Sequence, residues 1–290
     1  MQTLQNISDT AQKQNKLHIN EVAEAAKCNI LSRLWAALIF FTRLPLWRIS
    51  TPPKKAFESV VEFWPLTGWL TGAVMGGIIY MLAPYNQLMA VTVAIAARML
   101  LTGALHEDGL ADFFDGFGGG CNRTRILEIM KDSHIGTYGV LSLILYCLAV
   151  VISVGTIDYR IAAPLVAFAD PFAKMVASHI IFLPYARAEQ EAKSKTLYRP
   201  MSFVRYIFMV VQGLLPLGLF ILYISYLANM EGAVILENWL NVLLIICPLA
   251  TAAFLTMLIN KKIRGYTGDC CGALFLLTEL SILITASFIM

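Results

Sequence analysis

Long apolar runs separated by short polar segments are the dominant pattern of this chain. Seven runs reach the length of about 20 mostly apolar residues that a helix needs to cross a bilayer. They cover roughly 63–84, 87–105, 136–156, 161–184, 204–228, 238–259 and 271–290. The pattern therefore predicts an all-α, polytopic integral membrane helical bundle with about seven transmembrane helices.

A shorter apolar stretch, 31–49, precedes these runs and differs from them. Arg33, Arg43 and Arg48 flank its apolar core, and Pro45 interrupts it. Because the uninterrupted core is too short to cross a bilayer, we expect an N-terminal interfacial or re-entrant helix here.

No linker rich in Pro, Gly or Ser divides the chain, so we expect a single membrane domain over 30–290. Residues 1–29 are polar and lack the apolar region of a secretory signal. They predict a cytoplasmic N-terminal tail ahead of that domain.

The composition supports a membrane protein. Of the 290 residues, 58% are hydrophobic and 14% are charged, whereas soluble domains carry about 25% charged residues. With so few charges, we expect the lipid bilayer as the environment and no nucleic-acid partner. The six cysteines form no C-x-x-C pair, so neither a disulfide framework nor a zinc site is indicated.

Lysine and arginine are distributed unevenly between the polar segments. If the N-terminus lies in the cytoplasm, the inner segments with the adjoining Arg205 hold nineteen of these residues, and the outer segments hold only Arg160. The inner segments are 1–62, 106–135, 185–203 and 260–270. Since positive residues accumulate in cytoplasmic loops, this asymmetry predicts a cytoplasmic N-terminus.

Three aspartates follow the second apolar run at helical spacing. Asp108, Asp112 and Asp115 stand at i, i+4 and i+7, on one stripe of a helix. Ionised carboxylates this close repel one another unless a divalent cation lies between them. Gly109 and Gly116 would weaken a merely solvated acidic helix. We therefore interpret the stripe as a metal site, with Mg²⁺ as the expected cofactor.

The residues after this stripe add glycine and basic side chains. Residues 117–120 predict a flexible turn whose backbone amides can approach an anion. The candidate phosphate-binding or proton-transferring groups beyond it are Arg123, Arg125, Lys131, Asp132 and His134. A metal held by a few carboxylates and completed by substrate phosphates is the usual magnesium arrangement. The whole segment is thus interpreted as a phosphate site.

Further candidate residues lie outside this segment. Thr267 and Asp269, in the last cytoplasmic loop, either contribute a hydroxyl and a carboxylate to the site or cap the last helix. Arg43 stands beside aromatic residues that suit a membrane-interface belt, which does not explain the arginine itself. His106 and His134 suit phosphate donors, proton shuttles or ordinary hydrogen-bonding roles equally.

Ionisable residues also occur inside the apolar runs, where such groups usually face a bundle interior or a cavity. Asp170 and Lys174 stand at i, i+4, so we expect them to pair, and we interpret them as part of the substrate site. Arg98 is expected to balance the aspartate stripe. Glu279 suits a structural or a functional role equally.

These residues also carry a family resemblance. The stretch 102–116, with its three aspartates, closely resembles the signature of the cobalamin (5′-phosphate) synthase family, also called adenosylcobinamide-GDP ribazoletransferase. The matching blocks that accompany it, in the family's order, are 41–45, 130–139, 184–187 and 267–273. Departures from the family pattern occur at Ala104, Glu107, Phe113, Phe114 and Arg264. None of them replaces an expected metal ligand.

The resemblance implies a bacterial inner-membrane enzyme of late cobalamin assembly, with its active site facing the cytoplasm. Such an enzyme joins adenosylcobinamide-GDP to α-ribazole or its 5′-phosphate, releases GMP and requires Mg²⁺. We hypothesise that the three aspartates hold the metal against the diphosphate and that Lys131, with Arg123 or Arg125, contacts phosphate. Asp132 or Asp269 would take the ribazole proton or ligate the metal. The resemblance is compatible with a homo-oligomer and with association with other cobalamin-assembly enzymes.

Three other classes of membrane protein share some of these features. CDP-alcohol phosphotransferases place an arginine where Asp112 stands here, and intramembrane prenyltransferases usually carry a second aspartate cluster that this chain lacks. A metal-ion or vitamin transporter would suit the charges inside the apolar runs, but the chain shows no inverted repeat. The leaving group separates the enzymes: GMP, CMP or inorganic diphosphate.

Overall fold

The computed structural model of the chain describes residues 28–187, 201–231 and 238–290, and within these ranges every regular element is a helix. The predicted tail therefore lies outside the described residues except for its last two. The α-helices are α2 (Ile30–Phe41), α3 (Lys54–Phe57), α4 (Trp64–Leu82), α5 (Gln87–Thr102), α6 (Leu105–Gly119), α7 (Arg123–Ile129), α8 (Thr137–Gly155), α9 (Tyr159–Ser178), α10 (Phe203–Glu231), α11 (Asn238–Ile263) and α12 (Gly268–Ile289). Short 3₁₀ turns are η1 (Leu46–Arg48), η2 (Val60–Phe63) and η3 (His179–Phe182).

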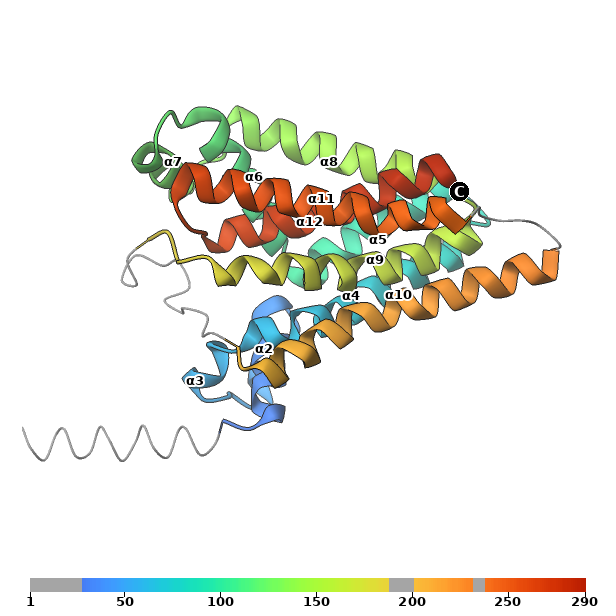
Figure 1. Cartoon of the computed structure of the whole chain (residues 1–290), viewed down its shortest axis with the longest axis horizontal. Coiled ribbons are helices and arrows are strands. Elements are labelled where there is room, and N and C mark those ends of the chain that lie inside the picture. Colours follow the sequence, from blue (N-terminus) through green and yellow to red (C-terminus); the bar gives the residue numbers. More distant parts are fainter. Residues whose placement is uncertain (1–27, 188–200, 232–237) are drawn as a thin grey trace, which may run out of the picture.

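The long helices run side by side as one bundle (Figure 1). Among the described residues, six helical segments are long and apolar enough to cross a membrane, and a bent helix pair makes a seventh if it counts as one span. The six segments are Val60–Leu82, Thr137–Gly155, Tyr159–Phe182, Phe203–Leu227, Val242–Ile263 and Gly268–Ile289. This confirms the predicted polytopic helical bundle.

The bent pair, α5 and α6, differs from the second predicted span, 87–105. Helix α5 ends at Thr102, and α6 leaves it at an angle of 94°. Gly103 and Ala104 both adopt left-handed backbone angles, with φ of 68° and 54°, and two such residues in succession end a right-handed helix. The aspartate stripe therefore lies on a helix, as predicted, but the flexible turn expected at 117–120 was wrong, because 117–119 complete α6.

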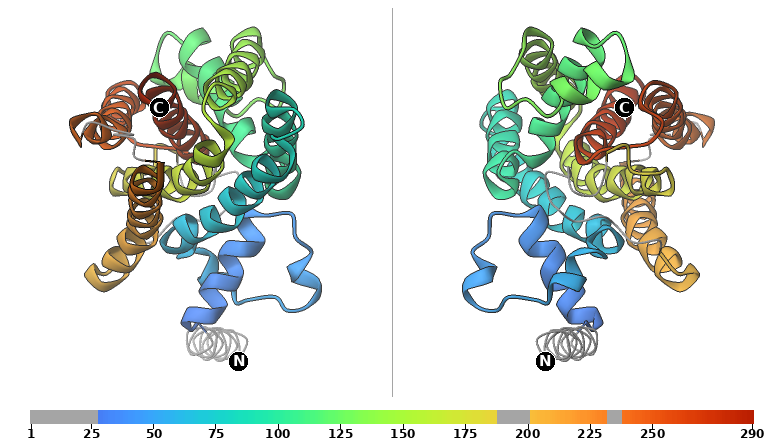
Figure 2. Two further views of the ribbon diagram at one scale, coloured as in Figure 1. Left: turned by 90° about the vertical axis from the view of Figure 1, so that its right-hand side faces the viewer. Right: turned by 90° about the vertical axis from the view of Figure 1, so that its left-hand side faces the viewer.

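Helix α2 confirms that the stretch 31–49 does not cross the membrane as one helix. It is an apolar helix of 12 residues that ends at Phe41, ahead of Pro45. Figure 2 shows this N-terminal segment projecting from one side of the bundle. Arg33 anchors it through an ion pair of 2.7 Å with Glu62, at the start of the first predicted span.

Helices α4 and α9 form the most extensive helix–helix contact among the described residues, and glycines allow them to approach closely. Gly68, Gly72 and Gly76 repeat every four residues along α4 and face α9. A Cβ atom added at Gly72 would lie 2.8 Å from the carbonyl oxygen of Ala167. Small residues at this spacing are typical of close helix contacts in membranes, where packing rather than the hydrophobic effect drives association.

We expect Gly72→Ala to lower the free energy of unfolding by about 1–3 kcal/mol, because the added methyl group has no room against α9. Gly77, on the same helix, supplies the matched control, since an added Cβ would meet nothing within 4 Å. Gly77→Ala should be neutral or stabilise by up to about 1 kcal/mol through helix propensity. Thermal unfolding of both purified variants in detergent measures the difference, and equal midpoints would contradict the packing assignment.

Candidate active site

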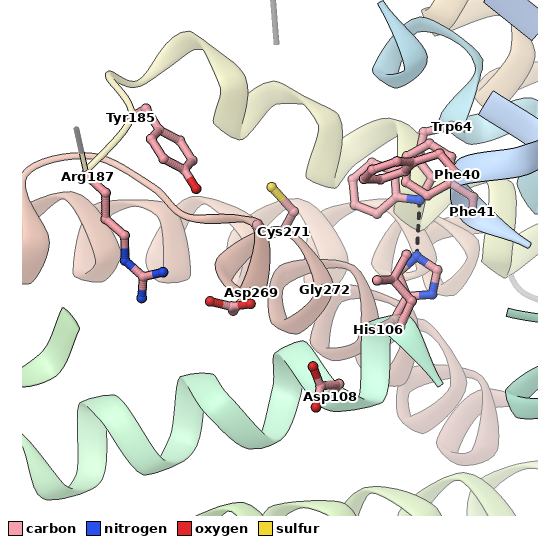
Figure 3. Close-up of a pocket in the computed structure, with 12 residues that line it drawn as sticks. Phe40, Phe41, Trp64, His106, Asp108, Tyr185, Arg187, Asp269, Cys271 and Gly272 are labelled. Carbon is pink, nitrogen blue, oxygen red and sulfur yellow. Dashed lines mark hydrogen bonds between the residues drawn. The ribbon is translucent and has the colours of Figure 1, made fainter. Parts of the chain in front are cut away.

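Two glycines bring α6 against the N-terminal end of α12. A Cβ atom added at Gly109 would lie 2.9 Å from the backbone carbonyl oxygen of Asp269, and one added at Gly272 would lie 3.0 Å from the carbonyl oxygen of His106. Because neither position carries a side chain, the two backbones approach closely. This contact places Asp108 and Asp269, 161 positions apart in the sequence, beside the same hollow (Figure 3).

The hollow is a cavity of about 150 Å³. Its walls come from α2, the start of α4, α6, the 185–187 segment and α12. The lining residues are Phe40, Phe41, Trp64, Leu105, His106, Asp108, Tyr185, Arg187, Gly268, Asp269, Cys271 and Gly272. Aromatic rings gather at one end and charged side chains at the other (Figure 3). A cavity of this form suits a ligand that has both a flat ring and an anionic group.

The aromatic end is a stack of three rings. The His106 ring lies 5.8 Å from Trp64 and 6.3 Å from Phe41, nearly parallel to both. The indole Nε1 of Trp64 donates a hydrogen bond of 3.3 Å to Nε2 of His106. Since an indole N–H can only donate, this Nε2 carries no proton. If His106 transfers a proton or binds phosphate, as predicted, it does so through Nδ1, because Nε2 is engaged with Trp64.

The charged end holds two carboxylates and an arginine. Asp108 and Asp269 line it together with Arg187, a residue to which the sequence assigned no role although it lies in a recognised block. Tyr185 borders the same space, and burial raises the pKa of its hydroxyl, so the group stays a hydrogen-bond donor at neutral pH. Thr267 caps α12 by accepting a hydrogen bond from the backbone N–H of Cys270, which bears out the cap interpretation of that loop.

Other predicted site residues lie around a second hollow, between α6, α7 and α8. Asp115, Arg125, Asp132 and His134 line it, and none of them lines the first cavity. Hydrogen bonds from the backbone N–H and the ring of His134 hold the pKa of Asp132 below its usual value. The carboxylate is therefore ionised at neutral pH. The sequence placed all these residues in one site, whereas the fold divides them between two.

Asp115 has a structural role that the sequence did not indicate, and its role as a metal ligand stays a prediction. Its two carboxylate oxygens accept hydrogen bonds of 2.7 and 2.8 Å from the backbone N–H groups of Gly136 and Gly139, at the start of α8. A carboxylate at the positive end of a helix stabilises it. Asp112 lies between Asp108 and Asp115 on α6, about one turn from each.

The basic residues expected to contact phosphate have different surroundings. Arg123 donates hydrogen bonds of 2.8 and 2.6 Å to the carbonyl oxygens of Ile263 and Ala186, so it joins the end of α11 to the 184–187 segment. Arg125 is exposed and pairs with Glu128 at 3.2 Å, and Lys131 is exposed beyond α7. Arg43 lies at the α5–α6 bend, in a separate hollow that Thr102 and Gly103 also line.

Comparisons with known proteins identify the family to which this chain belongs. The family model described as cobalamin-5-phosphate synthase matches residues 33–287. The chain belongs to the cobalamin-5-phosphate synthase family. This confirms the family expected from the motifs, and the match includes both hollows and every predicted site residue.

Curated relatives in this family match most of the chain. An adenosylcobinamide-GDP ribazoletransferase of Pseudoalteromonas atlantica is 36% identical over 81% of this chain and 83% of its own length. Relatives of the same name from Shewanella baltica and Ralstonia pickettii are each 32% identical, over 84% and 86% of this chain and 89% and 93% of their own lengths. No solved structure matches the chain.

The family resemblance implies Mg²⁺, and the side chains of the site determine whether this ion can bind there. Among the described residues, no group of three or more His, Cys, Asp or Glu side chains is arranged to hold a metal ion. Magnesium, however, is commonly held by one or two carboxylates, with water and substrate phosphates as the other ligands. The oxygen donors of Asp108 and Asp269 fit a Mg²⁺ ion that binds together with a phosphate ligand. Metal binding by the aspartate stripe stays a prediction.

A buried network of charged side chains lies inside the bundle, outside the lining of the cavity. Asp170 and Lys174 form the predicted pair at 2.6 Å, and Thr71 donates to Asp170 at 2.7 Å. The expected partner of Arg98 was wrong: its side chain forms an ion pair of 2.6 Å with Glu279, not with the aspartate stripe. Neither Asp170 nor Lys174 lines the cavity, and their predicted contact with substrate stays untested by this arrangement.

Proposed function

We propose that this chain transfers the cobinamide phosphate of adenosylcobinamide-GDP to α-ribazole, or to α-ribazole 5′-phosphate, and releases GMP. The observation that carries the proposal is the contact between α6 and α12, which places Asp108 and Asp269 in one cavity with an aromatic wall. The names of the relatives support the same reaction. Four of the five sequence blocks that carry the family resemblance contribute residues to this cavity, and the fifth, 130–139, lines the second hollow.

In this reaction a ribose hydroxyl attacks the phosphorus atom next to cobinamide, and the bond from that phosphorus to the GMP oxygen breaks. Negative charge spreads over the phosphoryl oxygens in the transition state. Bound Mg²⁺ would neutralise this charge. Asp108, with Asp112 one turn along α6, would hold the metal, and Asp269 would either complete its ligands or take the hydroxyl proton. Asp132, the other predicted base, does not line the cavity.

The size of the cavity limits how much of the substrates it encloses. Cavities that enclose drug-sized ligands usually measure about 300–1,000 Å³, whereas this one measures about 150 Å³. The corrin macrocycle therefore remains outside, next to the aromatic residues of α2 and α4. The diphosphate and one flat ring are the parts of the two substrates whose chemistry matches the charged and the aromatic ends of the cavity.

We further propose that the enzyme lies in a bacterial inner membrane with this cavity facing the cytoplasm. Arg123, Ala186 and Ile263 belong to three segments expected on the cytoplasmic side, and their hydrogen bonds join those segments at one end of the bundle. The arrangement supports the positive-inside orientation, because the basic segments share one end. That orientation would place the cavity where nucleotides and Mg²⁺ are abundant.

The leaving group tests this function. The purified full-length chain, given adenosylcobinamide-GDP, α-ribazole and Mg²⁺, is expected to form GMP and the joined corrinoid in equal amounts, as measured by chromatography. Chelation of the metal with EDTA should stop the reaction, and added Mg²⁺ should restore it. CMP or inorganic diphosphate as product from the corresponding substrates, with no GMP, would contradict the proposal. So would nucleotide-independent metal uptake into proteoliposomes by a chain that makes no GMP.

A further inference from the structure

We propose that Arg187 binds the diphosphate of the GDP-bearing substrate and is the main cationic phosphate ligand of the cavity. The identity of the ligand rests on the proposed function. The geometry itself points to an anion with several oxygen acceptors, held opposite the carboxylate pair Asp108 and Asp269.

The state of the Arg187 side chain is the first observation. Only 9% of the residue is exposed, and its side chain lines the cavity, with the guanidinium group directed into it (Figure 3). One terminal nitrogen donates a hydrogen bond of 3.1 Å to the carbonyl oxygen of Leu127. The Nε atom is buried and has no hydrogen-bond partner among the described residues. Because one nitrogen has no acceptor, the guanidinium group keeps donor capacity that a ligand oxygen in the cavity can use.

The backbone next to Arg187 is the second observation, because its hydrogen bonds fix the main chain from which the side chain extends before any ligand binds. Ala186 donates to the carbonyl oxygen of Tyr266 at 2.8 Å, and Tyr266 donates to that of Pro184 at 3.0 Å. Arg123 adds a hydrogen bond of 2.6 Å to the carbonyl oxygen of Ala186. A donor that is already held in position loses little conformational entropy when it binds, which raises affinity.

Among the basic residues that the sequence associated with phosphate, none is as well placed as Arg187. Arg123 is engaged with two backbone carbonyl groups, and Arg125 pairs with Glu128 at the surface. Lys131 is exposed and lies outside the lining of the cavity. Arginine also suits the task chemically, since its planar fork of donors matches two phosphate oxygens at once.

The Arg187 assignment can be tested with Arg187→Met and Arg187→Lys in the full-length enzyme. We expect Arg187→Met to raise the KM for the GDP-bearing substrate and the inhibition constant of free GDP by about 10- to 100-fold, as for loss of a charge-assisted hydrogen bond. The KM for α-ribazole should stay within about twofold, and Arg187→Lys should recover part of the loss. The matched control is Arg160→Met, an exposed arginine that pairs with Asp158 at 2.9 Å outside the cavity.

Two measurements separate phosphate binding from a structural role through Leu127. Guanidinium ion added to Arg187→Ala should restore part of the GDP affinity, which a general loss of fold would not allow. Unchanged KM and GDP inhibition in Arg187→Met, or reduced thermal stability with no rescue, would overturn the assignment. GDP binding followed by thermal shift requires no turnover. A wild-type chain that makes no GMP but binds GDP through Arg187 would thus refute the function and leave this assignment standing.

Discussion

Replacement of Asp269 by asparagine is expected to lower the rate of GMP release by about 100- to 1,000-fold while the helical bundle stays folded. The carboxylate lines the cavity with Asp108, and loss of a single group that stabilises transition-state charge commonly has an effect of this size. Asp108→Asn should behave in the same way, because both carboxylates serve the same bound phosphate. Steady-state assays of GMP release on purified variants measure the effect.

The control for these aspartates is Asp158→Asn, outside the cavity. Asp158 caps α9 by accepting a hydrogen bond from the backbone N–H of Arg160, and asparagine is an equally good cap. Its activity should stay within about twofold of wild type. Near-wild-type turnover in Asp108→Asn and Asp269→Asn would contradict the assignment of this cavity as the active site. Wild-type turnover in Asp112→Ala or Asp115→Ala would contradict metal binding by the stripe at that position.

Arg98→Met is expected to reduce the free energy of unfolding by about 3–5 kcal/mol, the largest effect on stability that we expect for this chain. Breaking a buried ion pair leaves an uncompensated charge, which is strongly unfavourable. Arg98 donates to Glu279 at 2.6 Å and to the hydroxyl of Tyr146 at 2.6 Å, and it lies 3.7 Å from Glu107. The carboxylates of Glu107 and Glu279 are both buried, and both would lose the cation that balances their charge.

Glu279→Gln supplies the matched comparison within the same network. Arg98 would keep Glu107 and Tyr146 as neighbours, and the glutamine amide oxygen would still accept a hydrogen bond, so we expect a smaller loss than for Arg98→Met. Thermal or denaturant unfolding in one detergent compares the two variants. Equal losses would show that Glu107 does not depend on Arg98. An unchanged midpoint in Arg98→Met would contradict the buried network altogether.

Local patterns predicted the parts of this protein that depend on residues close together in the sequence. The apolar runs predicted the spans, and the i, i+4 spacing of Asp170 and Lys174 predicted their ion pair. The position of Thr267 before the last run allowed a helix cap, which is present. In each case neighbouring residues determine the structure, so the sequence carries the whole signal.

Predictions failed where the partner of a residue is far away in the chain. Arg98 has its partner 181 positions away, at Glu279, so proximity in sequence to the aspartate stripe was misleading. Asp115 accepts from amides at the start of α8, a contact that depends on how α6 and α8 pack. The bend after Thr102 lies within a continuous apolar run and depends on left-handed angles at Gly103 and Ala104.

The amino-acid sequence by itself determined that this is a helical membrane protein, that acidic side chains form a stripe on one helix, and that the chain belongs to its family. Only the tertiary structure decided which charged groups share a cavity. Asp108, Asp269 and Arg187 line one cavity, while Asp115, Asp132 and His134 lie around another hollow. The physical reason is close helix packing at Gly109 and Gly272, where missing side chains let α6 and α12 touch. Helical periodicity shows which face a residue occupies, but not which distant helix packs against that face.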